Sequence, residues 1–188
     1  MEEYLKSSME SGEQLLWSGG STSGKVWDNT YRIPYFLRFL ISYGLVIALM
    51  AYAFHKNGEL KISVILVLAV IGSMIPLTAV ADGIKTRSLG YAATDRRLIR
   101  VNGSMMYTAN YEDISVCGFR KDPSGNTSLL CGSKALKSKP SKWRGLALFT
   151  GTHERDPENH VTDYVFYAVD DPEGLKKALT GKVNFTEK

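Results

Sequence analysis

The chain has 188 residues, a formal net charge of +4 and a mean hydropathy of −0.12, values that taken alone are typical of a small soluble protein. The charges are unevenly distributed, however: residues 35–81 carry four charged side chains, whereas residues 82–188 carry 17 Lys and Arg against 13 Asp and Glu. This distribution argues against a uniformly soluble chain. It predicts an apolar segment followed by a polar, mildly basic domain.

The first 34 residues are interpreted as a cytoplasmic N-terminal segment that contains a Trp-Ser-Gly motif at Trp17–Gly19. Residues 1–30 hold no apolar run, so we expect no cleavable signal peptide. The two cysteines, Cys117 and Cys131, are expected to be reduced and to pack as small apolar side chains, because nothing in the sequence indicates export to an oxidising compartment.

Residues 35–81 predict a hairpin of two transmembrane helices. The runs 35–54 and 62–81 are each 20 residues long, and a helix of that length spans about 30 Å, the thickness of a bilayer core. Asn57 and Gly58 lie in the short connection and indicate a turn. Small residues at four-residue spacing, Gly44 with Ala48 and Ala69 with Ser73, are expected to allow close helix packing.

The positive charges near the ends of the hairpin predict that both termini are cytoplasmic. More Lys and Arg lie on the terminal side than in the turn, which holds Lys56 and Lys61, and cytoplasmic flanks carry the excess of such residues. The residues on the terminal side are Arg32, Arg38, Lys85, Arg87, Arg96, Arg97 and Arg100. We therefore expect an integral protein of the plasma membrane with two spans.

Residues 82–188 predict a cytoplasmic β-rich domain. Short β-branched and aromatic runs alternate with turn residues, which is typical of antiparallel sheets. The expected strands are 90–94, 98–102, 105–111, 116–120, 127–131, 146–150 and 164–169. A final helix is predicted from Asp171 as N-cap and Pro172 as first residue, with Gly181 ending it. Seven antiparallel strands closed by a C-terminal helix outline a pleckstrin-homology-like (PH-like) barrel.

Two segments also carry a family resemblance. The sequence Leu-Leu-Trp-Ser-Gly at 15–19, the two apolar runs, and Tyr-Ala-Ala-Thr-Asp-Arg-Arg-Leu-Ile at 91–99 follow in the order found in bacterial PH-like membrane proteins, which this chain resembles over most of its length. The resemblance implies a cytoplasmic PH-like domain held at the membrane of a bacterium. It implies no enzyme activity.

The segment 133–145 is the first candidate site. It is basic and no acidic residue occurs between Asp122 and Glu154. Beside an anionic leaflet each such cation contributes about 1 kcal/mol, and a Trp ring prefers the headgroup level. The residues are Lys134, Lys137, Lys139, Lys142, Trp143 and Arg144. The segment is interpreted either as a contact for anionic phospholipid headgroups or as a solvated loop between strands.

Arg96 and Arg97 form a second candidate site. They follow Asp95 in a predicted strand turn, where paired guanidinium groups can hold a phosphate. The alternative is that Asp95 closes the turn and both arginines lie in water or face the membrane.

Other patterns are incomplete. The stretch 19–25 reads G-x-x-x-x-G-K, but Val26 replaces the Ser or Thr that a phosphate-binding loop needs. His153 and His160 lack the spacing of metal ligands. We therefore expect neither cofactor nor metal, no catalytic residues, and no nucleic-acid partner, since the net charge is low.

Two hypotheses about function follow. In the first, the protein is a membrane-anchored binding module that presents its domain to a protein or an anionic lipid headgroup. In the second, it is a structural or accessory subunit whose hairpin packs against another membrane protein. An enzyme would need a nucleophile, base or metal site that the sequence does not contain.

Overall fold

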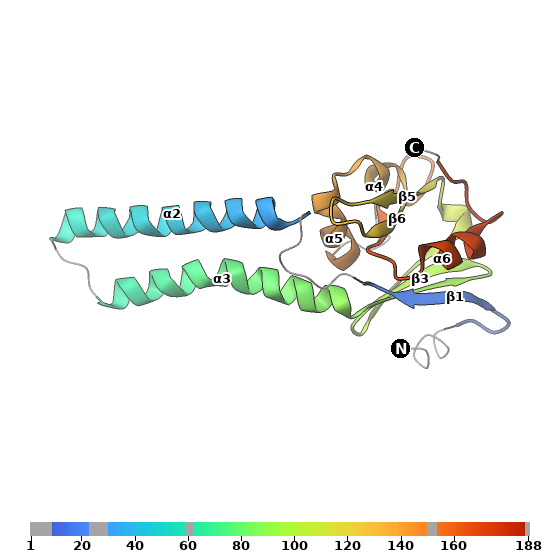
Figure 1. The fold of residues 1–188 in the computed structure, drawn as a ribbon, viewed down its shortest axis with the longest axis horizontal. Helices are drawn as coiled ribbons and strands as arrows, with labels where there is room; N and C mark the ends of the chain where they lie inside the picture. Colours follow the sequence, from blue (N-terminus) through green and yellow to red (C-terminus); the bar gives the residue numbers. More distant parts are fainter. Residues whose placement is uncertain (1–8, 23–29, 59–61, 150–153, 187–188) are drawn as a thin grey trace. The chain divides into compact units, whose positions relative to one another are not determined.

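The computed structural model describes residues 9–22, 30–58, 62–149 and 154–186, and it divides into two compact units (Figure 1). One unit, here called the β domain, combines Met1–Gly24 with Ile84–Lys188. The other, the helical unit, is Lys25–Gly83. The N-terminal segment therefore folds with the C-terminal half of the chain, although the helical unit separates them in sequence.

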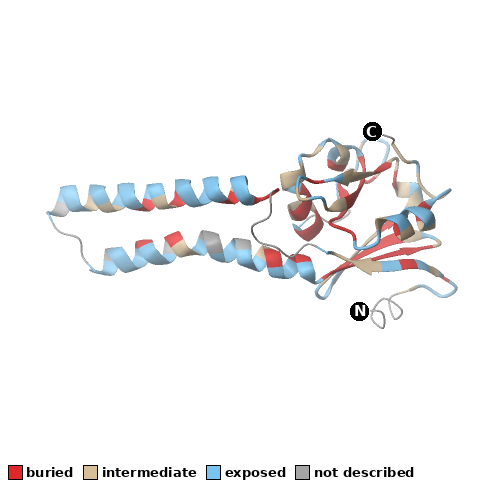
Figure 2. Ribbon diagram, in the orientation of Figure 1, coloured by how far each residue is buried: buried red, intermediate tan, exposed pale blue. Residues whose placement is uncertain are grey.

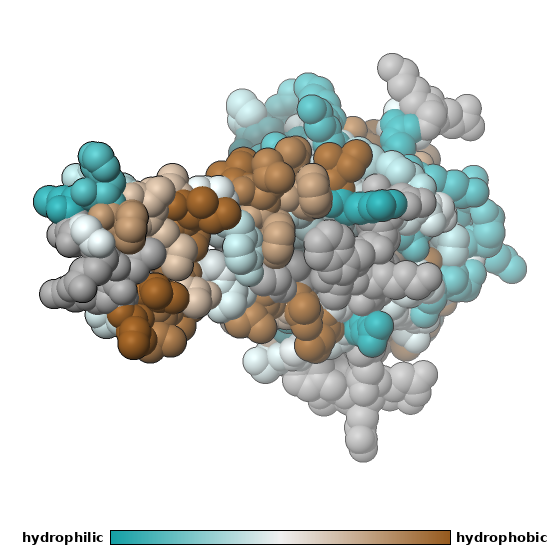
Figure 3. Space-filling model, turned by 60° about the vertical axis from the view of Figure 1, so that its left-hand side comes forward, coloured by the Kyte–Doolittle hydropathy of each residue, from teal (hydrophilic) through white to brown (hydrophobic). Residues whose placement is uncertain are grey.

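Two long helices make up the helical unit, α2 (Arg32–Asn57) and α3 (Ile62–Arg87), the second of which runs on into the β domain. α2 ends where Gly58 takes a left-handed conformation (φ 73°) and donates its N–H to the carbonyl of Phe54 at 2.8 Å. Most side chains of both helices are exposed (Figure 2), and apolar residues gather over their surface (Figure 3). Exposed apolar surfaces of this extent mark a contact either with a membrane or with another protein.

α2 is long and apolar enough to cross a membrane, as the run 35–54 predicted. A signal sequence near the N-terminus would show the same properties. The second predicted run, 62–81, lies within the continuous helix α3.

At the contact between α2 and α3 lies Gly72, a small residue outside the pairs expected from the sequence. A Cβ atom on Gly72 would lie 3.6 Å from a methyl of Val46 and 3.7 Å from the ring of Tyr43. Gly72 is therefore the residue that lets the two helices approach. Gly44, by contrast, is exposed, and a Cβ there would meet nothing within 4 Å among the described residues.

The larger sheet of the β domain is antiparallel, with the strand order β1-β2-β3-β4. Its strands are β1 (Leu15–Gly20), β2 (Leu89–Thr94), β3 (Arg97–Asn102) and β4 (Met105–Asn110). β2, β3 and β4 were predicted, but β1 was not. β1 holds the Trp-Ser-Gly motif and pairs with β2, so Gly19 lies opposite Tyr91.

The smaller sheet consists of β5 (Cys117–Lys121), β6 (Thr127–Cys131) and β7 (Tyr164–Phe166), also antiparallel. The predicted barrel is wrong, because the two sheets do not close. A 3-10 turn at Tyr111–Asp113 separates β4 from β5, and in the described chain the edges of the sheets meet at one isolated bridge, between Ser21 and Val169.

The strand predicted at 146–150 is also wrong. The connection from β6 to β7 instead contains two helices, α4 (Ser133–Lys137) and α5 (Pro140–Phe149), and residue 150 lies outside the described chain. Pro140 suits the first position of a helix. The spacing of Trp143 and Ala147, both buried, places them on one helical face toward the core.

The cysteines are joined by a disulfide, contrary to the expectation of reduced thiols. Cys117 and Cys131 are directly opposite each other in the β5–β6 ladder, and opposite residues of an antiparallel pair bring their Cβ atoms within bonding range. The predicted strands 116–120 and 127–131 each contain one of the cysteines, but the expectation of reduced thiols did not take their pairing into account.

The core between the sheets contains aromatic rings around a buried cation. Arg100, fully buried, donates from Nη1 to the carbonyl of Val165 at 3.2 Å and lies 4.9 and 5.0 Å from the ring centroids of Tyr107 and Tyr164. Tyr91 stacks on Phe166 with centroids 4.5 Å apart. Burial raises the pKa of both Tyr91 and Tyr164, so both stay neutral hydrogen-bond donors.

The C-terminal helix α6 (Pro172–Leu179) is confirmed, and it begins as predicted. Asp171 accepts the N–H of Gly174 at 2.9 Å. The same carboxylate accepts the indole N–H of Trp17 at 3.2 Å. The helix cap thus also holds β1, which connects the N-terminal motif to the end of the chain.

Candidate anion-binding pocket

The candidate site lies where α4 and α5 meet. The start of α4 depends on Gly132, whose φ of 95° and contact with the backbone of Val161 and Thr162 exclude any side chain. The carbonyl of Thr162 accepts the N–H groups of Lys134 and Ala135 at 2.9 and 3.0 Å. The start of α4 is therefore fixed against the chain that leads into β7.

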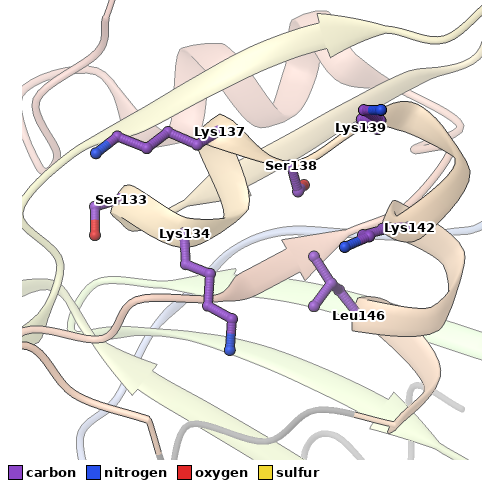
Figure 4. A pocket seen from close by; sticks show the side chains of 7 residues that line it. All are labelled: Ser133, Lys134, Lys137, Ser138, Lys139, Lys142 and Leu146. Atoms are coloured by element: carbon purple, nitrogen blue, oxygen red, sulfur yellow. The ribbon is translucent and has the colours of Figure 1, made fainter.

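A cavity of about 610 Å³ opens between the two helices. Its lining residues, which we call the lysine pocket, are Ser133, Lys134, Lys137, Ser138, Lys139, Lys142 and Leu146. α4 contributes Lys134 and Lys137, the connection contributes Ser138 and Lys139, and α5 contributes Lys142 and Leu146 (Figure 4). Lysine provides three N–H donors and a positive charge, so the lining is suited to anions.

The ammonium groups of the pocket are spread around it rather than directed at one point (Figure 4). In the described chain Lys134 forms an ion pair with Glu154, and no carboxylate is within ion-pair distance of Lys137, Lys139 or Lys142. The hydrogen bond to Glu154 raises the pKa of Lys134. Three separated cations favour a ligand with several anionic groups, or an anionic surface, over a single small ion.

Trp143 and Arg144, which the sequence placed in the same site, do not line the pocket. Both are buried. The indole of Trp143 donates to the carbonyl of Ser138 at 3.3 Å, and the guanidinium of Arg144 lies 5.6 Å from the ring centroid of Tyr167. These two residues attach α5 to the core and hold the connection between the helices, so the predicted headgroup contact of Trp143 is not supported.

Arg96 and Arg97 lie in a separate cluster at the β2–β3 turn. Arg97 donates from Nε and Nη2 to the carboxylate of Glu13 at 2.9 and 2.8 Å. Arg96 lies 3.6 Å from Glu10 and 3.9 Å from Asp95. Both guanidinium groups are thus paired with carboxylates of the chain itself. Neither of the two interpretations of Arg96 and Arg97 drawn from the sequence included this pairing.

Glu13 is the centre of this cluster. Its side chain is fully buried and also accepts the hydroxyl of Thr94 at 2.7 Å and the N–H of Glu10 at 2.8 Å. Burial acts to raise the pKa of Glu13, but the hydrogen bonds from Arg97, Glu10 and Thr94 outweigh it and lower the pKa to about 2. The carboxylate is therefore charged and bound internally.

Sequence reasoning missed Ser133, Ser138 and Leu146, because the segment was treated either as a loop or as part of a strand. The helical signal was present: Pro140 is followed at three and seven residues by Trp143 and Ala147.

The remaining sequence candidates gain little from the structure. His153 and residues 23–25 of the G-x-x-x-x-G-K stretch lie outside the described residues, and Gly19 is part of β1. His160 lies in a turn, 3.5 Å from Asp156. Within the described chain no group of three His, Cys, Asp or Glu side chains is arranged to hold a metal ion.

Comparison of the chain with protein-family models, with curated proteins and with solved structures gives no significant match.

Proposed function

We propose that this protein is a membrane-anchored module that binds anionic phospholipid headgroups through the lysine pocket. The observation that carries the proposal is the group of three lysines, Lys137, Lys139 and Lys142, that face one cavity without carboxylate partners in the described chain. Headgroup phosphates would supply the missing negative charges.

Anchoring makes weak contacts sufficient. α2 and α3 are proposed to be the two spans, so the β domain is held beside the bilayer and lipid binding becomes an intramolecular event at high effective concentration. Three cations near an anionic leaflet contribute about 3 kcal/mol together, which is small for a free protein but substantial for a tethered one. The proposal retains the resemblance to bacterial PH-like membrane proteins, with open sheets in place of a closed barrel.

Hydrogen–deuterium exchange of the full-length protein in nanodiscs tests the pocket. We expect peptides covering 133–146 to exchange more slowly in phosphatidylcholine mixed with phosphatidylglycerol than in phosphatidylcholine alone, because bound headgroups restrict opening of α4 and α5. High salt is expected to remove the difference, since it screens exposed charges. The double variant Lys137→Glu/Lys142→Glu should also remove the difference in exchange between the two lipid compositions.

The control carries the same two changes on α6, Lys176→Glu/Lys177→Glu, where both lysines are exposed and lie outside the pocket. It should keep the lipid-dependent protection. Slower exchange with soluble glycerol phosphate alone would indicate a soluble ligand instead. If hydrogen exchange does not depend on lipid charge, the headgroup proposal is wrong and the accessory-subunit hypothesis is favoured. The exposed Gly44 and Ala48 offer a helix-packing face for such a subunit contact.

The orientation of the β domain is the second part of the proposal. The excess of Lys and Arg beside the hairpin favours cytoplasmic termini, whereas the Cys117–Cys131 disulfide is of a kind that persists in oxidising compartments. The proposal follows the flanking charges, because they act during insertion, before the disulfide forms.

A membrane-impermeant maleimide applied to bacterial spheroplasts tests the orientation. Lys177→Cys on α6 is expected to react after lysis and not before, while Lys56→Cys at the end of α2 should react in intact spheroplasts. The reverse labelling pattern would place the β domain outside the cytoplasm. The disulfide would then lie in an oxidising compartment, where disulfides ordinarily persist.

A further inference from the structure

Large apolar side chains are exposed at one end of the β domain. Met105 is 61% exposed, Met106 37% and Phe149 62%, although most apolar residues of this domain are buried. Ile84, in the last part of α3, is 65% exposed. Exposed apolar residues that occur singly are ordinary, but a group of them on one rim indicates a contact surface.

The sheet register places Met105 and Met106 at the same end of the sheet, with Met105 on the face that α5 covers and Met106 on the other face. Asn102 lies opposite Leu89 on one side and opposite Met105 on the other, and its amide donates to the carbonyl of Leu148 at 3.0 Å. The β3–β4 turn therefore lies beside the end of α5, at the end of the sheet where the chain leaves α3 (Figure 1). Leu16, the other large exposed apolar residue of the domain in the described chain, is near the opposite end of the sheet.

The last turn of α3 is in contact with the same rim. The ammonium group of Lys85 lies 5.8 Å from the ring centroid of Phe149. Lys85 and Arg87 are the basic residues of that turn, and no charged residue occurs between Ile62 and Ala81. Apolar side chains beside basic ones, at the end of a helix that carries no charge from Ile62 to Ala81, match the chemistry of the headgroup boundary of a bilayer.

We infer that Met105, Met106 and Phe149 form an apolar tip that inserts into the interfacial region of the lipid bilayer. The occupant of this surface is lipid rather than a protein, because the tip adjoins the last turn of α3, where the cation of Lys85 lies beside the ring of Phe149. This inference rests on the proposed membrane anchoring by α3 but not on the lysine pocket.

The tip and the lysine pocket share one face of α5. Lys142, Leu146 and Phe149 follow at intervals of four and three residues, so they share one face of α5. Seven residues of helix rise about 10 Å, so Lys142 lies about that far along α5 from the tip.

Spin labelling of the full-length protein in nanodiscs tests the tip. Nitroxides attached at Met105→Cys and Phe149→Cys are expected to collide more often with oxygen than with a water-soluble nickel complex, because they lie among lipid. A nitroxide at Lys177→Cys is the control. α6 is followed by Lys182, which donates to the carbonyl of Asp95 at the opposite end of the sheet, so this label should show the reverse preference.

The outcomes separate the tip from the proposed function. If the labels at the tip collide more often with the nickel complex while the protein still resists extraction by alkaline carbonate, the inference about the tip is overturned. The proposed membrane anchor would then remain in place. Spin–spin broadening at Met105→Cys would assign the surface to a second copy of the chain and also overturn the inference. Lys137→Glu/Lys142→Glu should leave the label depths unchanged, whereas loss of the protein from the bilayer would remove anchor and tip together.

Discussion

The β2–β3 turn and the α4–α5 connection are both basic in sequence, but the structure gives their cations opposite roles. At the turn, Arg97 and Arg96 face Glu13 and Glu10, which lie more than eighty residues earlier in the chain. In the lysine pocket, Lys137, Lys139 and Lys142 face a cavity. The first cluster satisfies its charges internally and stabilises the fold, whereas the second leaves them available to a ligand.

The largest expected effect comes from breaking the internal cluster. Glu13→Gln should lower the free energy of unfolding of the β domain by about 3–5 kcal/mol at pH 7, because it removes one member of a buried ion pair and leaves Arg97 without its bidentate partner. Urea unfolding of the full-length protein in detergent, followed by near-ultraviolet circular dichroism, measures the change. An effect as small as that of Glu112→Gln, an exposed control expected within about 0.5 kcal/mol, would contradict a structural role.

The same variant should alter the dependence of stability on pH. Glu13 has a pKa of about 2 in the folded protein against an ordinary value of 4.5, so the unfolded chain binds its proton more readily. The stabilisation is therefore complete above pH 4.5 and declines as the pH falls toward 2. In Glu13→Gln this part of the decline should be absent, and a profile parallel to that of the unchanged protein would argue against the lowered pKa.

The elements that the sequence predicts are those encoded by neighbouring residues. α2 follows from an uninterrupted apolar run, α6 from Asp171 and Pro172 at its start, and the β3–β4 turn from Asn102 and Gly103. In each case the signal and the element occupy the same few residues. The residues of a single segment are then enough to assign the type of element.

The misassigned parts depend on residues that meet only in the fold. β1 has no alternating pattern of its own and becomes a strand by pairing with β2, about seventy residues later. The apolar run at 146–149 is too short to distinguish a strand from a helix. The disulfide requires the β5–β6 register, which a compartment argument does not contain.

The candidate site could likewise be predicted only in part from the sequence. A run of lysines without acidic neighbours predicts a basic surface, and four of its members line one cavity. Sequence does not indicate which cations are buried, however, so Trp143 and Arg144 were grouped with the lysines although they pack into the core. Nor does it indicate that Arg97 has a carboxylate partner 84 residues away.

The smallest effect on stability is expected in the lysine pocket, and that result sharpens the contrast between the clusters. Lys137 and Lys142 are exposed and have no carboxylate partner in the described chain, so reversing both charges breaks no internal pair. Lys137→Glu/Lys142→Glu should therefore change the free energy of unfolding by about 0.5 kcal/mol or less, measured by the same urea unfolding in uncharged detergent. A loss comparable to that of Glu13→Gln would show that the lysines serve the fold, and the case for a ligand at this cavity would fail. Retained stability with lost lipid-dependent protection would assign these charges to binding alone, because a residue that only maintains the fold cannot affect one without the other.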